Sequence, residues 1–88
     1  MTYEVKFTKP AQKMFKKLTQ EVQDRIQSKI NELAIEPRPS GVKKLKSQEN
    51  TCRIRVGDYR VIYEIFDDIL LVKIVEVGHR SEVYKDES

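Results

Sequence analysis

Three arginines flank a tight turn that the sequence predicts in the second half of the chain. Gly57-Asp58 separates two alternating apolar–polar runs, which is typical of a two-residue hairpin turn. In that register Arg55 lies directly opposite Arg60 on the outer face, with Arg53 two residues away. Opposed like charges are unfavourable, but guanidinium groups bind phosphate through paired hydrogen bonds and hold their charge permanently. The pattern therefore predicts either an anion site or a solvated, charged sheet face.

The other reactive side chains give weaker signals. Cys52 falls on the inward side of its strand, which favours a small core residue over a reactive thiol. His79 ends the last predicted strand, where its position beside Arg80 favours an ordinary surface histidine over a catalytic group. Asp67-Asp68 lies at a hairpin tip without a third ligand nearby, which favours a turn over a metal pair. One cysteine and one histidine exclude a disulfide and a four-ligand Cys/His zinc site, so we expect no metal or cofactor.

Lysines dominate the first half of the chain. Residues 1–48 carry 11 basic and 5 acidic residues, whereas residues 49–88 carry 6 and 9. Such a basic excess is compatible with a nucleic-acid surface, and equally with the solvated back of a helix. The candidate contact residues are Lys9, Lys13, Lys16, Lys17, Lys43, Lys44 and Lys46.

The spacing of apolar residues along the sequence predicts the helices and strands that position these residues. Residues 2–7 alternate, which predicts a half-buried strand. Thr8 is a helix N-cap with Pro10 tolerated in the first turn. Two apolar stripes at helical spacing then predict two helices, and the Pro-rich residues 36–41 end the second. The stripes are Ala11, Met14, Phe15 and Leu18, then Val22, Ile26, Ile30 and Leu33.

From residue 42 onward, apolar residues recur at every second position, as in a β-strand. A short strand is expected within residues 42–45, followed by strands over residues 52–56, 59–66 and 69–78. The continuous apolar run at residues 69–72 indicates a central strand covered on both faces. We therefore expect one α+β domain over residues 1–88: an N-terminal strand, a two-helix antiparallel hairpin, and a mainly antiparallel three- to four-stranded sheet, in the order β-α-α-β-β-β.

The composition agrees with a soluble protein. Hydrophobic residues make up 39% and charged residues 35% of the 88 residues. No apolar run approaches the ~20 residues that cross a bilayer, and the first residues lack a basic-then-apolar signal region. We therefore expect a cytoplasmic location and no membrane association.

Two segments resemble the RelE/ParE family of bacterial toxins. They are residues 53–64, RIRVGDYRVIYE, and residues 75–84, VEVGHRSEVY. The resemblance extends over essentially the whole chain and is greater to the RelE branch, so it implies the RelE-like fold. Toxins of that branch are ribosome-dependent endoribonucleases that cut mRNA in the A site and so inhibit translation. The ParE branch shares the fold and poisons DNA gyrase without nuclease activity.

The resemblance also implies a role for each matching residue. Arg53 and Arg55 match basic residues beside the scissile phosphate, and Arg60 matches the arginine that stabilises charge on it. Arg80 matches the arginine assigned to the leaving group, and Tyr84 the tyrosine that orients the substrate nucleotide. The implied reaction is attack of a ribose 2′-OH on the adjacent 3′-phosphate, without a metal. Arginine is a poor general base because its pKa exceeds ~12, so Tyr84 and His79 are the alternatives for that role.

Partners follow from the same resemblance. The family implies a cognate antitoxin with an acidic, partly disordered C-terminal part, and contacts with the ribosome and mRNA through the lysine set given above. Operator DNA is expected to be bound only through the antitoxin complex. Two other functions stay open at this point: a gyrase inhibitor, and a catalytically degenerate homologue that only binds the antitoxin.

Overall fold

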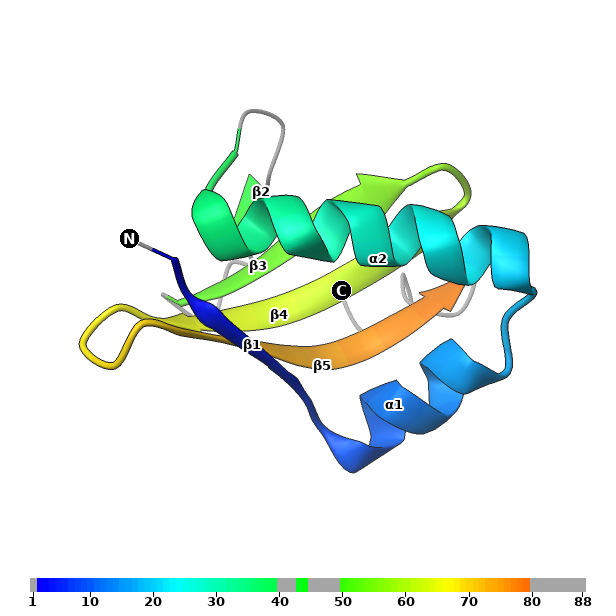
Figure 1. The fold of residues 1–88 in the computed structure, drawn as a ribbon, viewed down its shortest axis with the longest axis horizontal. Coiled ribbons are helices and arrows are strands. Elements are labelled where there is room, and N and C mark those ends of the chain that lie inside the picture. The colour runs from blue at the N-terminus through cyan, green and yellow to red at the C-terminus, as the bar shows by residue number, and fades with distance from the viewer. Residues whose placement is uncertain (1, 40–42, 45–49, 80–88) are drawn as a thin grey trace.

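A mixed β-sheet carries two helices on one of its faces (Figure 1). The computed structural model describes residues 2–39, 43–44 and 50–79. Within them five strands are arranged in the order β1-β5-β4-β3-β2. β1 is parallel to β5, and the other neighbours are antiparallel. The elements are β1 (Glu4–Phe7), α1 (Lys9–Lys16), α2 (Gln20–Ile35), β2 (Lys43–Lys44), β3 (Thr51–Val56), β4 (Tyr59–Phe66) and β5 (Leu71–His79).

Side-chain caps begin both helices. The Oγ1 of Thr8 accepts a hydrogen bond from the Ala11 N–H at 3.3 Å, and Thr19 caps α2 in the same way through the Val22 N–H at 3.3 Å. Each cap satisfies one of the four N–H groups that a helix leaves unpaired at its start. The predicted cap at Thr8 and the break between the helices are therefore confirmed.

The core lies between the helices and one face of the sheet. It contains Ala11 of α1, three residues of α2, and the inward residues of β3, β4 and β5. The three α2 residues are Ile26, Ile30 and Leu33, as the second apolar stripe predicted. Cys52 is also in this cluster, 5% exposed, which confirms its interpretation as a core residue. No helix in the described part of the chain is long and apolar enough to cross a membrane.

One polar group is buried within this core. The Tyr63 side chain is fully buried, and its hydroxyl donates a 2.7 Å hydrogen bond to the backbone oxygen of Pro37. Burial raises the pKa of this phenol well above its usual value near 10. The bond fixes the Pro-rich segment after α2 against the sheet.

The β3–β4 hairpin has the predicted register. Val56 pairs with Tyr59, Ile54 with Val61, and Cys52 with Tyr63. Gly57 occupies the turn with φ of 61°, a left-handed conformation that glycine adopts without a steric penalty. The two-residue turn therefore sets which side chains share a face along both strands.

Two details of the sheet differ from expectation. The strand expected over residues 69–78 begins at Leu71, because Ile69 and Leu70 belong to the preceding turn. Ile69 is 64% exposed and Leu70 has a positive φ of 51°, so the apolar run is only partly a strand. The expected central position is confirmed, since β5 lies between β1 and β4. A register shift at Ile62/Tyr63 also interrupts the β4–β5 ladder.

Candidate functional site

The sheet face away from the helices carries two rows of residues across β3, β4 and β5. One row pairs Arg55 with Arg60, and Arg60 in turn with Gly78. The other row pairs Arg53 with Ile62, and Ile62 with Glu76. Because side chains alternate along a strand, both rows lie on the face opposite the helix-facing Ile54, Val61 and Val77. We call these six residues the outer-face array.

The arginines of the array differ in exposure. Arg60 is only 4% exposed, Arg53 is partly buried and Arg55 is exposed. Arg60 has a charged neighbour on one side, whereas on its other side Gly78 contributes no side chain. A guanidinium with little water around it interacts more strongly with a nearby anion than one in bulk solvent.

Backbone carbonyls near the hairpin turn hold two of these side chains. The Nε of Arg55 donates to the oxygen of Gly57 at 3.2 Å, and Nη1 of Arg60 donates to the oxygen of Tyr59 at 3.3 Å. Both bonds run from the arginine toward the turn, so both guanidinium groups are held at the same end of the hairpin. Donors that are fixed before a ligand arrives are what stabilisation of developing negative charge requires.

Acidic groups near the array are arranged in a way that the sequence did not reveal. Glu64 of β4 forms an ion pair with Lys73 of β5 at 3.7 Å. Glu76 is the acid of the array itself, diagonal to Arg60 and partly buried. Diagonal residues on neighbouring strands lie about 7–8 Å apart, within reach of long side chains. Glu76 could be found only once the β4–β5 register was known.

A second charged cluster lies at the β4–β5 turn, at the other end of the sheet. Arg38 donates two hydrogen bonds to Asp67, at 3.1 and 2.9 Å, and the Tyr3 hydroxyl donates a third at 2.7 Å. The bonds from Arg38 and then Tyr3 lower the pKa of Asp67 to about 2. This cluster joins three distant segments, and Asp67 therefore has the structural turn role favoured by its sequence position.

Comparison with known proteins then assigns the chain to a protein family. Residues 5–84 match the family profile described as the ParE toxin of type II toxin–antitoxin systems. The chain belongs to this toxin family. Among curated relatives, the mRNA interferase toxin RelE of Escherichia coli K12 is 30% identical over 90 residues, which cover 98% of this chain and 94% of RelE. Toxin RelG of Mycobacterium tuberculosis is 30% identical over 86 residues, 97% of this chain and 99% of RelG.

Solved RelE structures share the fold of this toxin-family chain. A mutant of E. coli toxin RelE in the free state superposes with a TM-score of 0.82 at 28% identity, covering 99% of this chain and 95% of that one. RelE in the archaeal RelE–RelB complex of Pyrococcus horikoshii gives 0.80 at 33% identity, covering 91% and 97%. The predicted family and the RelE-like α+β fold are therefore confirmed.

The structure brings some of the predicted site residues of the toxin together and separates others. Arg53, Arg55 and Arg60 share the outer-face array. His79 does not, because it pairs with Tyr59, whose side chain packs against the core on the helix side. The two rings are in edge-to-face contact, with centroids 5.5 Å apart. Arg80, Tyr84 and Lys46 lie outside the described residues.

The predicted lysine surface is also distributed over separate parts of the fold. The side chains of Lys9, Lys13, Lys16 and Lys17 are all exposed at α1, which packs against β5 on the helix side of the sheet. They therefore lie on the opposite side from the outer-face array. Lys43 and Lys44 form β2, where Lys43 is the backbone partner of Arg53. Among the described residues, no three His, Cys, Asp or Glu side chains lie close enough to hold a metal ion.

Proposed function

We propose that this chain is the toxin of a type II toxin–antitoxin system that cuts mRNA in the ribosomal A site and so inhibits translation. The observation that carries the proposal is the row Arg55–Arg60–Gly78, in which two arginines are opposed and one side is left without a side chain. Such an arrangement is unfavourable by itself and becomes favourable once a phosphate group lies against it. The relative named mRNA interferase toxin RelE supports this assignment over a purely binding role.

The proposed reaction is an internal transfer at one phosphate of the RNA. The ribose 2′-oxygen forms a bond to the adjacent phosphorus while the bond from phosphorus to the 5′-oxygen of the next nucleotide breaks. The products are a 2′,3′-cyclic phosphate and a 5′-hydroxyl, and no metal or cofactor takes part. Arg60 and Arg55 stabilise the charge that builds on the phosphate oxygens, and Arg53 binds beside them. Arg80 stabilises the charge on the leaving 5′-oxygen, which becomes a hydroxyl by taking a proton from solvent water, and Tyr84 orients the substrate nucleotide.

The proton of the 2′-hydroxyl requires an acceptor that arginine cannot provide. Glu76 is a carboxylate on the same face as the arginines, and its register position is diagonal to Arg60. His79 lies on the helix side of the sheet instead, in contact with Tyr59. We therefore assign proton abstraction to Glu76, with Tyr84 and His79 as the competing acceptors that a pH–rate profile distinguishes.

The partners follow from the same assignment. Antitoxin-bound structures of relatives, such as the RelE–RelB complex of P. horikoshii, support a cognate antitoxin for this chain. An acidic, partly disordered antitoxin segment would complement the basic first half of the toxin. The toxin acts in the cytoplasm, where the ribosomes are, and the lysines of α1 and β2 contact RNA. Operator DNA is bound only through the complex with the antitoxin.

The test is primer extension on an mRNA engaged with translating ribosomes. We expect cuts within the A-site codon from the wild type and on the order of a hundredfold less cleavage from Arg60→Ala. Arg25→Ala is the matched control, since Arg25 is exposed on α2 and pairs only with Glu21 at 3.4 Å among the contacts described. Undiminished cleavage by folded Arg60→Ala would refute the site. Absence of cuts together with inhibition of gyrase supercoiling would assign the chain the activity of the ParE branch instead.

A further inference from the structure

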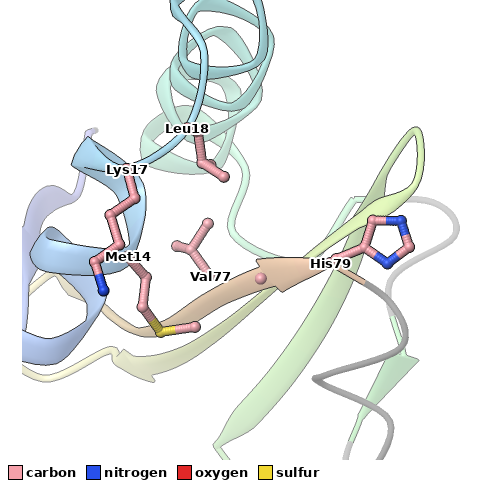
Figure 2. Close-up of a pocket in the computed structure, with 6 residues that line it drawn as sticks. Met14, Lys17, Leu18, Val77 and His79 are labelled. Atoms are coloured by element: carbon pink, nitrogen blue, oxygen red, sulfur yellow. The ribbon is translucent and has the colours of Figure 1, made fainter.

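A pocket opens between the end of α1 and the end of β5 (Figure 2). Its volume is about 290 Å³, and it is lined by Met14, Lys17, Leu18, Val77, Gly78 and His79. Val77 is fully buried and Leu18 is partly buried against the core, so they form an apolar floor. Lys17 is exposed and places a cationic group at the rim, whereas the exposed imidazole of His79 points away from Leu18 and Val77 (Figure 2).

The strand register connects this pocket to the outer-face array. Gly78 lines the pocket and is also the partner of Arg60, and His79 is the partner of Tyr59. The pocket therefore lies on the helix-facing side of the sheet and the arginine pair lies on the opposite face. Both are at the C-terminal end of β5, about one residue apart along the strand. Gly78 is therefore the residue at which the phosphate site and the pocket meet.

We propose that this pocket binds one base of the RNA next to the scissile phosphate. The proposal rests on the proposed function and adds a substrate contact to it. Single-stranded RNA is recognised by unstacked bases that lie against aromatic, histidine or apolar side chains, with cationic groups on the backbone. The pocket supplies two of these: an apolar floor, and the Lys17 ammonium group at the rim.

The size of the pocket favours one ring system over a protein segment. Small-molecule sites have volumes of about 300–1,000 Å³, and this pocket lies at the lower end of that range. A helix of an acidic partner would need a longer apolar groove, with anchors spaced over several turns. A single base with its phosphate near Lys17 matches both the volume and the charge.

The direct test uses the isolated toxin and four nucleoside monophosphates, so it does not depend on cleavage. In NMR titrations we expect the signals of Leu18 and Val77 to shift with the monophosphates and not with ribose 5-phosphate or inorganic phosphate. Met14→Phe replaces a flexible wall of the pocket with a rigid ring and is expected to weaken binding about tenfold, as loss of one base contact does. Gln12→Phe adds the same ring at an exposed position of α1 and is expected to leave binding unchanged.

A second variant guards against misfolding of Met14→Phe. Lys17→Glu reverses a charge at an exposed site and is expected to weaken binding by a similar factor, whereas Lys29→Glu on α2 is its control. The same variants are then assayed for the nucleotide preferred beside the cut, which we expect to relax. Equal shifts with ribose 5-phosphate would overturn the base pocket, and so would signals that respond only to an acidic peptide. Cleavage by the wild type with an unaltered preference in Met14→Phe would overturn the inference while leaving the nuclease in place.

Discussion

Reversing the charge of Arg55 should stabilise the fold while it removes activity. In the wild type the opposed pair with Arg60 costs about 0.2–1 kcal/mol, and an opposite-charge pair at the same positions gains a similar amount. Arg55→Glu also loses the exposed bond to the Gly57 oxygen, which is worth about 0.5 kcal/mol. The net gain in the free energy of unfolding is therefore between about 0 and 1.5 kcal/mol, with a midpoint near 0.7 kcal/mol. In a domain of this size the midpoint raises the unfolding temperature by about 3–6 °C.

The cleavage rate of Arg55→Glu should fall, although its stability rises. A glutamate beside Arg60 occupies the guanidinium that would otherwise meet the phosphate and repels the phosphate itself. Loss of one preorganised donor costs about 3–4 kcal/mol in the transition state, so the cleavage rate should fall at least a hundredfold. The two assays are thermal unfolding followed by circular dichroism and single-turnover cleavage of ribosome-bound mRNA.

The control and the salt dependence make this prediction refutable. Arg25→Glu makes the same change on α2, next to Glu21 rather than another arginine, and should destabilise slightly and cleave normally. The stability gain of Arg55→Glu should shrink as salt rises, because screening at 0.1 M acts over ~10 Å. A variant that is less stable at low salt, or that still cleaves at the wild-type rate, would show that the arginine pair is not an anion site.

Three further predictions concern single groups. Glu76→Gln should lower the cleavage rate by about 10²–10⁴-fold and remove the acidic limb of the pH–rate profile. Glu64→Gln, the control, should retain the wild-type rate and the acidic limb. An acidic limb that persists in Glu76→Gln would assign the general base to another residue. Asp67 has a folded pKa of about 2 against ~3.9 unfolded, so its contribution to stability should be complete above pH ~4 and lost as the pH falls toward 2. An acid titration of the unfolding temperature should show this loss in the wild type and not in Asp67→Asn; equal profiles would contradict it. Tyr63→Phe leaves the Pro37 oxygen without its donor, so urea unfolding should report a loss of about 1–3 kcal/mol at an unchanged slope, and a loss below ~0.5 kcal/mol would show that the bond contributes little.

The arginine pair could be predicted from the sequence because its determinants are local. A two-residue turn with a glycine in the left-handed region fixes the pairing on both sides, so Gly57 alone places Arg55 opposite Arg60. The helix caps and apolar stripes are local in the same sense. These features depend on residues within a few positions of one another, where periodicity and turn chemistry decide the structure.

The remaining features depend on contacts between distant segments. The parallel pairing of β1 with β5, and the ion pair between Arg38 and Asp67 across 29 positions, have no signal in either segment alone. The position of Glu76 beside the arginines depends on the register of β4 against β5, which shifts at Ile62/Tyr63. The pocket likewise forms only where α1 meets β5, so no local sequence motif predicts it.

The parallel pairing of β1 with β5 has a consequence for when the toxin becomes active. Val5 pairs with Val72, so β1 waits during synthesis for a partner strand that is made much later. Contacts of such high sequence separation slow folding, and they cannot form until the later partner has left the exit tunnel. The sheet around Glu76 is therefore completed only after β5 has emerged and paired with β1. A nascent chain assembled in this order spends an interval without its complete outer-face array, during which an antitoxin already present can bind.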